Sequence, residues 1–318
     1  MSAGADATFG PVAADLAWLE EVIRGSFGDD HPAAAAPMAD LFASGGKRLR
    51  PALVLLCAHL GEYRFDRVAP AAIAVELTHA ATLVHDDVID RSPTRRGRPT
   101  AAASAGSEAA ILVGDHYFAR AYLESSRTGL AEVVSELAAA VMRICAAELE
   151  QQAALRNYHP SLESYMMRIE GKTAALLSAC CRIGGLLGGL DSPDREALGR
   201  YGNALGLAFQ IADDVLDYTS EESELGKPVG HDLLEGSATL PLMLSEGLDR
   251  MLPDGRRLSA ETVDAVVREV RSGQGPQRAL ARASELADEA RAELARFGER
   301  EAARTLDALA TYVVSRKL

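Results

Sequence analysis

Long stretches in which apolar residues recur every three to four positions place the strongest constraint on the fold of this chain. Four of them contain few helix-breaking residues, and strict alternation of apolar and polar residues is hard to find. A three-to-four spacing gathers apolar side chains on one face of an α-helix, whereas a half-buried strand needs alternation. The sequence therefore predicts an all-α protein, with its longest helices at residues 71–85, 131–155, 164–187 and 194–218.

The length of the chain is compatible with one large helical domain. By average domain size, 318 residues allow about two domains, but helical enzymes with a single core reach this size. Glycine, proline and polar residues gather between the helical stretches. Residues 1–12 are small and polar, so we expect them to be disordered, and we expect one domain over residues 13–318, closed by amphipathic helices near 278–297 and 301–314.

Charge and cysteine usage exclude several classes of protein. The chain has 33 Lys and Arg against 46 Asp and Glu, a net charge of −13, which argues against general binding to nucleic acid or anionic membrane. The longest apolar runs are shorter than the ~18 residues of a membrane span, and no secretory signal is recognisable. We expect a soluble, cytoplasmic protein with buried reduced thiols at Cys57, Cys145, Cys180 and Cys181.

Two copies of the motif DDxxD, 127 residues apart, are the strongest functional signal. In each copy the first and third Asp stand at i and i+4 and share one face of a helix with apolar flanks. Carboxylate oxygens suit Mg²⁺ or Mn²⁺ and disfavour zinc. A single copy is better explained as a solvated helix end, but two copies, each followed by basic residues, favour a metal site. The six predicted ligands are Asp86, Asp87, Asp90, Asp213, Asp214 and Asp217.

Basic residues next to helix boundaries are candidates for anion binding. Lys47, Arg48 and Arg50 precede an apolar helix whose first turn would contain Pro51, and such a helix start favours phosphate. The alternative is a solvated basic turn. Four arginines at residues 91–98 follow the first DDxxD motif, and they fit either a salt-bridged loop or a phosphate site.

Other features carry less information by themselves. The Gly-Lys pairs that contain Lys172 and Lys227 are weak signals, and the absence of GxxxxGK[ST] argues against an NTPase. His79 lies two helical turns before the first motif, and alone it is better explained as a core histidine.

In combination, these motifs resemble the trans-isoprenyl diphosphate synthases, also called polyprenyl synthetases. The resemblance runs from about residue 40 to residue 245 in the order typical of the family. It comprises GGKRLRP at 45–51, HDDVID…RRGRPT at 85–100, GD…FARA at 114–121, EGKT at 170–173, FQIADDVLD at 209–217, GKPVGHDL at 226–233 and TLP at 239–241.

The resemblance implies an all-α bundle around a deep central cavity, usually a homodimer, formed by a polyprenyl synthetase catalytic domain. It implies Mg²⁺-dependent, head-to-tail trans condensation of isopentenyl diphosphate with an allylic diphosphate, with about two or three Mg²⁺ ions per site, for which Mn²⁺ can substitute. The two Asp motifs would bind Mg²⁺ on the allylic diphosphate. Arg95, Lys172, Gln210 and Lys227 would assist them, Lys47, Arg50, His79 and Arg96 would bind isopentenyl diphosphate, and Thr173 and Gln210 would stabilise an allylic cation.

One position departs from the family pattern. The family often has Lys in the segment before TLP, whereas this chain has Ser237, so one contact to the allylic diphosphate is expected to be missing or rearranged.

Small residues before the first motif bear on product length. Bulky aromatic residues four and five positions before the first Asp block the growing tail in this family, and here those positions are Thr82 and Ala81, with Thr78 a further turn away. We therefore predict a product longer than about C20, in the range of roughly C30–C50.

Three alternatives remain open. The chain could be a farnesyl or geranylgeranyl diphosphate synthase of the same family. A class I terpene cyclase is disfavoured by the intact second DDxxD and by the Lys47 and Arg50 cluster. A non-catalytic partner subunit usually lacks some of the aspartates, and none is missing here.

Overall fold

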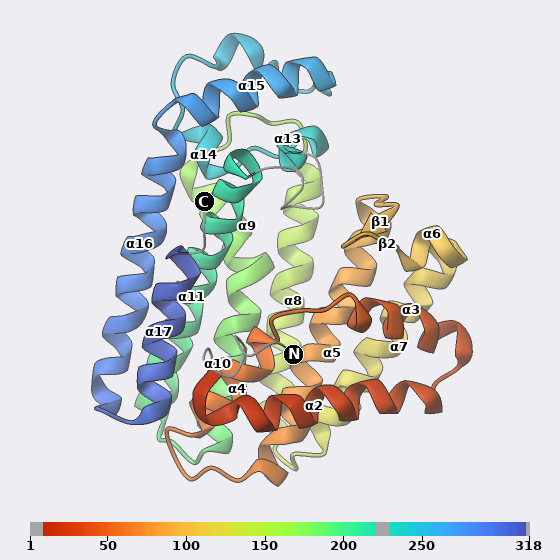
Figure 1. Cartoon of the computed structure of the whole chain (residues 1–318), viewed down its shortest axis with the longest axis vertical. Helices are drawn as coiled ribbons and strands as arrows, with labels where there is room; N and C mark the ends of the chain where they lie inside the picture. The colour runs from red at the N-terminus through yellow and green to blue at the C-terminus, as the bar shows by residue number, and fades with distance from the viewer. Residues whose placement is uncertain (1–8, 221–228, 316–318) are drawn as a thin grey trace. The chain divides into compact units, whose positions relative to one another are not determined.

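The structure is a computed structural model that describes residues 9–220 and 229–315. It is 78% helical, which confirms the all-α class (Figure 1). The deep central cavity implied by the resemblance stays a prediction. The shorter helices are η1 (Gly10–Val12), α2 (Ala13–Gly25), η2 (Ser26–Asp29), α3 (Pro32–Ala43), α4 (Leu49–Ala58), α6 (Ala101–Ala105), α7 (Ser107–Ser126), α13 (His231–Glu235), α14 (Leu240–Met243), η4 (Asp249–Met251), α15 (Ala260–Ser272), α16 (Gly275–Glu293), η5 (Leu294–Phe297) and α17 (Glu301–Ser315).

Three of the four longest predicted helices are continuous. They are α5 (Phe65–Ile89), α8 (Ala131–Ala153) and α11 (Ser192–Thr219). The fourth stretch is interrupted, because a five-residue π-helical segment, Glu170–Ala174, separates α9 (Leu162–Ile169) from α10 (Ala175–Leu187). Such segments are rare and occur often at functional sites. Apolar spacing alone does not reveal them.

A short hairpin follows the first DDxxD motif, in a segment for which no strand was predicted. Strand β1 (Thr94–Arg95) pairs antiparallel with β2 (Arg98–Pro99), and Arg95 lies opposite Arg98. The two turn residues, Arg96 and Gly97, have φ angles of 50° and 76°. Positive φ at both positions is the signature of a type I′ turn, which closes two-residue hairpins.

The start of the chain differs from the prediction for residues 1–12. Residues 1–8 lie outside the described part, but Gly10–Val12 forms a 3₁₀ helix and Val12 is fully buried. A Cβ atom on Gly10 would lie 3.0 Å from the hydroxyl of Thr305 on α17. The apolar side chains of Phe9 and Val12 therefore give this short segment a place in the core, so the expectation of disorder is wrong for residues 9–12.

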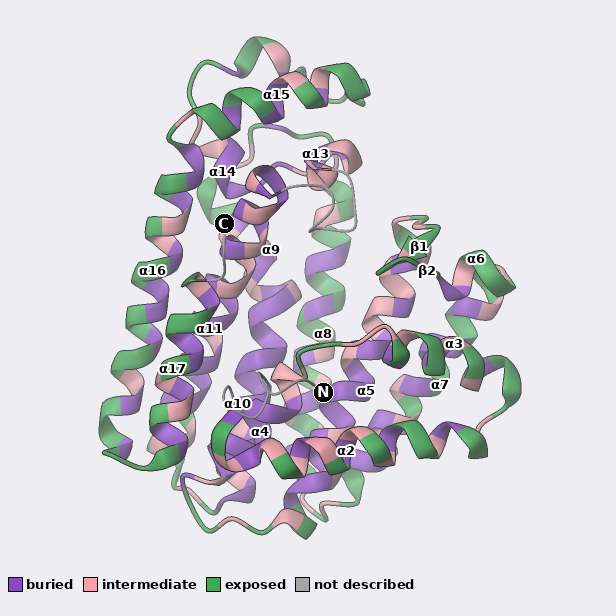
Figure 2. Ribbon diagram, in the orientation of Figure 1, coloured by how far each residue is buried: buried purple, intermediate pink, exposed green. Residues whose placement is uncertain are grey.

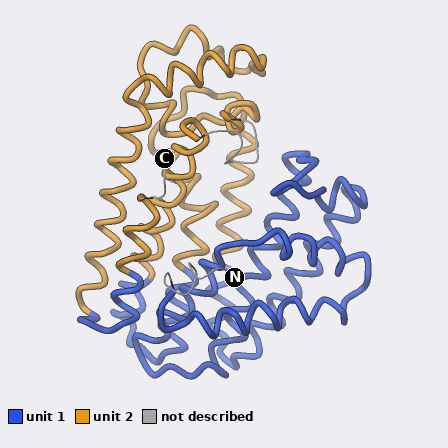
Figure 3. The backbone as a smooth tube through the Cα atoms, viewed as in Figure 1, with its two compact units in different colours: residues 1–139, 179–198, 297–306 blue, residues 140–178, 199–296, 307–318 orange. Residues whose placement is uncertain are grey.

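The described residues group into two compact units (Figure 3). Unit 1 comprises residues 1–139, 179–198 and 297–306, and unit 2 comprises residues 140–178, 199–296 and 307–318. A single catalytic domain over residues 13–318 stays a prediction.

Unit 1 contains α4, a helix with mostly buried residues. All eight residues from Pro51 to Ala58 are buried (Figure 2). Gly184 of α10 contacts this helix so closely that a Cβ atom would lie 2.3 Å from the carbonyl oxygen of Val54. A second apolar cluster in unit 1 joins α3, α5 and α7, with Phe27 in edge contact with Phe42 and Tyr117 at 5.3 and 5.9 Å between ring centroids.

Unit 2 has its own apolar cluster. Tyr218 at the end of α11 and Leu233 of α13 are fully buried in it, together with Val266 and Val270 of α15. This cluster packs the end of α11, which carries the second DDxxD motif, against α13 and α15.

Membrane and thiol expectations are met in part. Helix α5 is long and apolar enough to cross a membrane by length and composition, but 67% of that window is buried, as in a core helix. All four cysteines are free. Cys57, Cys180 and Cys181 are buried as predicted, whereas Cys145 on α8 is exposed, so the prediction is wrong for this thiol.

Candidate active site

The first DDxxD motif occupies the last turn of α5. Asp87 is 4% exposed and forms an ion pair with Arg95 of the hairpin. Nε of Arg95 lies 2.9 Å from Oδ1 and 3.1 Å from Oδ2 of Asp87, and Nη2 lies 2.9 Å from Oδ1. Burial raises the pKa of Asp87, and the Arg95 guanidinium offsets part of that rise. The type I′ turn reverses the chain, so that the Arg95 guanidinium contacts the acidic motif that precedes it in sequence.

His85, immediately before the motif, lies against α7. Its Nε2 is 3.1 Å from the carbonyl oxygen of Ile111 and 3.7 Å from Asp115. A Cβ atom on Gly114 would lie only 2.0 Å from that nitrogen, so the ring fits only against glycine. This contact explains why a Gly-Asp pair stands opposite the first motif.

His79 lies two turns earlier on α5, among arginines. Burial, and then the positive charges of Arg50, Arg95, Arg96 and Arg48, lower the pKa of His79 well below its usual range. The imidazole is therefore neutral near pH 7 and can donate a hydrogen bond without adding charge. Unit 1 thus brings together three of the predicted isopentenyl diphosphate ligands, Arg50, His79 and Arg96. Lys47 is exposed in the loop before α4.

The second DDxxD motif lies in the last two turns of α11, in unit 2. Asp214 is 2% exposed, and its two carboxylate oxygens have different partners. The hydroxyl of Tyr165 donates to Oδ2 at 2.7 Å, and the amide of Gln210 donates to Oδ1 at 2.8 Å. The hydroxyl of Thr173 in turn donates to Gln210 Oε1 at 2.7 Å. Unit 2 therefore connects the predicted residues Thr173, Gln210 and Asp214 in one hydrogen-bonded chain.

The π-helical segment brings Thr173 close to α11. A Cβ atom on Gly206 would lie 2.5 Å from the Cα of Ala174, and one on Gly171 would lie 2.6 Å from the Cβ of Ala147 on α8. Two glycines thus let the backbone around Thr173 approach α11 and α8 within contact distance. In this π-helical turn the side chain of Thr173 contacts Gln210, and the side chain of Lys172 contacts α8.

Lys172 contacts an acid that the sequence did not single out. Its ammonium group is 2.5 Å from Glu148 and 3.5 Å from the amide oxygen of Gln151, both on α8. The side chain of Glu148 is 11% exposed.

The third Asp of the second motif accepts from the backbone. Asp217 is 2% exposed, and its Oδ2 accepts from the N–H of Asp232 at 3.2 Å. The N–H of Ser237, at the position where the family often has Lys, donates to the carbonyl oxygen of Asp232 at 2.8 Å. Lys227, the remaining predicted diphosphate ligand, lies outside the described residues.

The surroundings of Asp214 perturb the pKa of its carboxyl group strongly. Burial first and the charge of Asp232 second raise its pKa to about 8, although its hydrogen bonds with Tyr165 and Gln210 and the charge of Arg168 act in the opposite direction. Near pH 7 this carboxyl group therefore holds a proton for much of the time when no cation lies beside it.

Within residues 9–220 and 229–315, no three His, Cys, Asp or Glu side chains come close enough to form a metal site by themselves. The donor set nevertheless suits a hard divalent cation, because both motifs present carboxylate oxygens and Asp214 lies where an added positive charge would be stabilising. A metal at either motif would need further oxygen ligands, such as those of a diphosphate.

The three predicted chain-length residues lie on α5 in different surroundings. Ala81 is fully buried within the apolar cluster that includes Phe42 and Tyr117. Thr78 is 1% exposed, whereas Thr82 is half-buried and donates to the carbonyl oxygen of His79 at 2.7 Å. Ala81 is therefore part of the helix packing in unit 1, and its role in product length stays a prediction.

Sequence reasoning missed Tyr165 and Glu148, which contact predicted residues directly. Tyr165 precedes Asp214 by 49 residues, and no local pattern links the two. Glu148 belongs to a mixed acidic and amide run on α8 that resembles any solvated helix face. Their roles follow only from tertiary contacts.

Comparison with known proteins identifies the family of this chain. A sequence profile of the family described as polyprenyl synthetase matches residues 31–257. The chain belongs to the polyprenyl synthetase family. Family membership makes it a trans-polyprenyl diphosphate synthase, a prenyltransferase, as the order of the motifs predicted.

Two curated relatives cover nearly the whole chain. Heptaprenyl diphosphate synthase component 2 of Geobacillus stearothermophilus is 35% identical over 306 residues, which are 95% of this chain and 96% of the relative. Nonaprenyl diphosphate synthase of Mycobacterium tuberculosis is 35% identical over 322 aligned positions, and the alignment covers 98% of this chain and 95% of the relative.

A solved structure is similar over its full length. The polyprenyl synthase of Caulobacter crescentus, complexed with calcium and isoprenyl diphosphate, has 35% sequence identity and a TM-score of 0.93 over 99% of this chain and 98% of its own.

The raised pKa of Asp214 predicts a specific pH dependence of stability. In the folded enzyme without ligands, Asp214 keeps its proton up to about pH 8, whereas the unfolded chain releases it near the ordinary pKa of 3.8. The folded state therefore binds more protons between these values, and this group's contribution to the free energy of unfolding is lost as pH rises toward 8. One group changes this free energy by at most about 1.4 kcal/mol per pH unit.

Denaturant unfolding at pH 6 and pH 8, without metal, measures this effect. We expect Asp214→Asn to lose less stability than the wild type between the two pH values, because the amide has no proton to release. Asp264→Asn, at an exposed position on α15, is the matched control and should keep the wild-type slope. Equal slopes for Asp214→Asn and the wild type would contradict the assignment.

Proposed function

We propose that this prenyltransferase condenses isopentenyl diphosphate with an allylic diphosphate to form a trans-polyprenyl diphosphate longer than about C20. The observation that supports this most strongly is that both DDxxD motifs place carboxylates in nearly dry sites, Asp87 in the first motif and Asp214 and Asp217 in the second, beside predicted diphosphate ligands. Buried carboxylates of this kind are unfavourable unless a cation compensates them.

Mg²⁺ fits the donor chemistry of both motifs. We assign it to Asp86, Asp87 and Asp90 in unit 1 and to Asp213, Asp214 and Asp217 in unit 2, with about two or three ions per active site and Mn²⁺ as a substitute. When bound, Mg²⁺ supplies Lewis-acid stabilisation of the negative charge on the diphosphate leaving group.

The protein side chains act around one bond exchange. The C1–O bond of the allylic diphosphate breaks, and its electron pair leaves with diphosphate. Arg95, Lys172 and Lys227 offset the growing negative charge on that leaving group. The double bond of isopentenyl diphosphate attacks C1, a carbon–carbon bond forms, and a proton passes from the isopentenyl unit to the released diphosphate.

We assign two side-chain oxygens to stabilisation of the allylic cation. Thr173, which is adjacent to Lys172 in sequence, donates a hydrogen bond to Gln210. The side-chain oxygens of Thr173 and Gln210 can face positive charge at C1. Isopentenyl diphosphate is assigned to Lys47, Arg50, Arg96 and the neutral His79. No side-chain nucleophile is needed, because every bond that changes belongs to the substrates.

A long product is supported by the small residues Ala81 and Thr82 and by relatives named for heptaprenyl and nonaprenyl products. A farnesyl or geranylgeranyl product is the alternative within the same chemistry. We also propose a cytoplasmic location.

The primary test is an assay of the purified protein with Mg²⁺, isopentenyl diphosphate and farnesyl diphosphate. We expect elongated prenyl diphosphates. Asp86→Ala and Asp213→Ala should each lower turnover by at least about 100-fold, because each removes charge compensation at the leaving group. Asp264→Ala, on the exposed face of α15, is the control and should retain wild-type turnover.

The products separate the alternatives. Cyclic hydrocarbons would identify a terpene cyclase, and no product would favour a non-catalytic subunit. Near-normal turnover in either Asp variant would contradict the assignment of its motif to metal and leaving group.

Product length has its own test in Ala81→Phe and Thr82→Phe. Both should shorten the products, because a ring at either position would block the growing tail. Ala81→Phe also adds a ring to a packed cluster, which costs about 1–3 kcal/mol of stability, so its unfolding must be measured alongside. Thr82→Ser is the matched control for size. An unchanged product distribution in folded Thr82→Phe and Ala81→Phe would refute this account.

We propose a homodimer, supported by large apolar side chains that are exposed on two helices. Leu112 on α7 is 68% exposed, and Met142 and Leu149 on α8 are 73% and 72% exposed. Exposed apolar side chains of this size are typical of protein contacts. Light scattering should give about twice the chain mass of 33.7 kDa, and Leu149→Glu should shift the protein toward monomer. A monomeric wild type would contradict the proposal and would favour a partner subunit.

A further inference from the structure

We propose that Arg48 is a positioning residue that fixes the loop carrying Lys47 and Arg50 and thereby sets the affinity for isopentenyl diphosphate. The inference rests on the proposed assignment of Lys47 and Arg50 to that substrate. The loop comprises residues 44–48 and joins α3 to α4.

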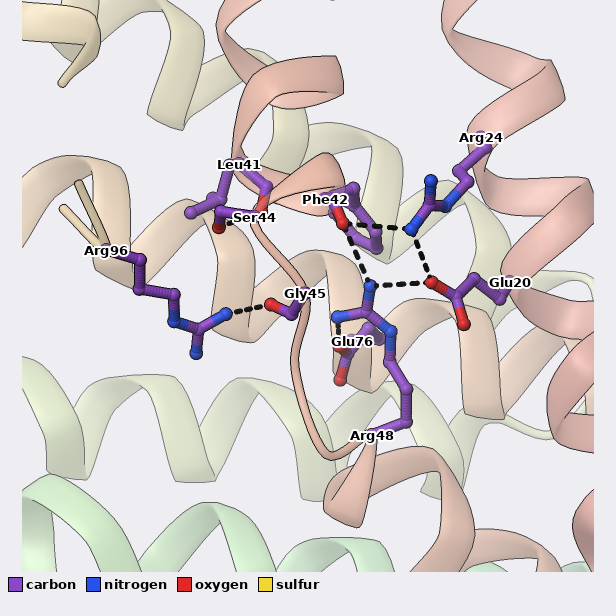
Figure 4. A network of polar contacts seen from close by, with 9 residues as sticks. All are labelled: Glu20, Arg24, Leu41, Phe42, Ser44, Gly45, Arg48, Glu76 and Arg96. Atoms are coloured by element: carbon purple, nitrogen blue, oxygen red, sulfur yellow. Dashed lines mark hydrogen bonds and ion pairs between the residues drawn. The ribbon is translucent and has the colours of Figure 1, made fainter. Parts of the chain in front are cut away.

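Arg48 is tied to three helices that surround the loop (Figure 4). Its Nη1 is 2.9 Å from Glu76 on α5, and its Nη2 is 3.2 Å from Glu20 on α2. Nη2 also lies 3.4 Å from the carbonyl oxygen of Phe42 on α3, and the guanidinium lies over the ring of that residue, 4.8 Å from its centroid. Only 11% of the Arg48 side chain is exposed, and only 6% of Glu76.

A second arginine completes the network without belonging to the loop. Arg24 on α2 donates to Glu20 at 2.6 Å and to the carbonyl oxygen of Phe42 at 3.1 Å. Although burial opposes the shift, Arg24 and Arg48 together lower the pKa of Glu20. Glu20 is therefore ionised and anchors both arginines, but only Arg48 transmits the contact to the loop backbone.

The backbone of the loop is shaped to deliver this side chain. Arg48 has a φ of 51°, in the left-handed region that L-residues seldom occupy, and it is the N-cap residue that precedes α4. A Cβ atom on Gly46 would lie 2.7 Å from Arg48 Nη1, so the guanidinium passes close to the backbone of the loop. Arg96 donates to the carbonyl oxygen of Gly45, which ties the other side of the loop to the hairpin (Figure 4).

The charge of Arg48 has a different use from that of its neighbours. Two carboxylates, Glu20 and Glu76, balance it. Arg50 follows within the first turn of α4. Among the arginines, the charge of Arg50 lowers the pKa of His79 most, and that of Arg48 lowers it less than those of Arg95 and Arg96. Arg48 therefore serves as an anchor, and the anion-attracting charge of this region comes from Arg50, Arg95, Arg96 and Lys47.

A fixed loop improves substrate affinity because the cost of ordering the backbone is met on folding and not on binding. Without its anchor, Lys47 and the first turn of α4 would have to be ordered by the substrate. The loss of affinity is expected for isopentenyl diphosphate alone, because the residues assigned to the allylic diphosphate do not belong to this loop.

Steady-state kinetics with each substrate varied separately tests the proposal. We expect Arg48→Met, which keeps the apolar stem, to raise KM for isopentenyl diphosphate about tenfold, with kcat and the allylic KM changed by less than about twofold. Arg48→Lys should fall between Arg48→Met and the wild type, because an ammonium cannot bridge two carboxylates and a carbonyl in the geometry of a guanidinium.

Glu76→Gln separates anchoring from direct substrate binding. If Arg48 anchors the loop, weakening its partner raises KM for isopentenyl diphosphate severalfold. A lower KM would mean that the released guanidinium binds substrate itself, and the proposal would be wrong. Should Arg48→Met fail to fold, Glu76→Gln and Arg48→Lys provide the same comparison.

Arg24→Met is the matched control. It removes an arginine that contacts Glu20 and Phe42 but lies outside the loop, so KM for isopentenyl diphosphate should stay within about twofold of the wild type. A rise equal to that of Arg48→Met would show a general effect of this network on stability and overturn the proposal.

Lys47→Met and Arg50→Met distinguish a failure of positioning by Arg48 from a failure of the substrate assignment. If both raise KM for isopentenyl diphosphate and Arg48→Met does not, positioning by Arg48 is wrong while the substrate assignment stands. If neither raises it, the substrate assignment itself fails, and the inference fails with it.

Discussion

Two carboxylates removed from water on otherwise apolar helices are the constraint on which the rest of this structure depends. Asp87 at the end of α5 and Asp214 near the end of α11 are each less than 5% exposed. A charge in such a place is unfavourable unless a partner compensates it. Asp87 has an arginine, whereas Asp214 has only neutral hydrogen-bond donors, Tyr165 and Gln210, and its pKa is correspondingly raised the more strongly.

The compensation explains local features that have no other evident cause. The type I′ hairpin of residues 94–99 returns Arg95 to Asp87, and the π-helical segment brings Thr173 to Gln210, which in turn binds Asp214. A regular helix through residues 170–174 would place Thr173 and Lys172 differently around the helix axis. Local irregularity is therefore concentrated where the acidic motifs need partners.

The sequence predicted the features that depend on regular spacing and missed those that depend on tertiary contact. Periodicity located α5, α8 and α11, and the duplicated DDxxD motif located the acidic residues. The break at residues 170–174 was not predicted, because an inserted residue in a long helix scarcely alters the apolar pattern. Tyr165 and Glu148 were missed for a related reason, since their partners are 49 and 24 residues away in sequence.

Burial was predicted less reliably than helix type. Cys145 lies in an apolar run of α8 yet is exposed, because that face of the helix has no partner in the described part of the chain. The effect of Ala81 on product length stays a prediction, and the sequence did not reveal that its side chain also packs in a cluster with Phe42 and Tyr117.

The basic residues divide into two groups by what their acidic partners would do during the reaction. Arg95 pairs with Asp87, and Lys172 pairs with Glu148. If Asp87 binds metal and both cations bind diphosphate, these pairs must open when substrates arrive. The acids then act as temporary partners, which keep each cation in place and limit its desolvation cost. Arg48 differs, because its acids, Glu20 and Glu76, have no part in the proposed chemistry and the contact can persist throughout a turnover. The two kinds of ion pair are complementary. Arg95 and Lys172 can exchange their acids for the diphosphate leaving group, while the ion pairs of Arg48 keep the backbone of residues 44–48 in place.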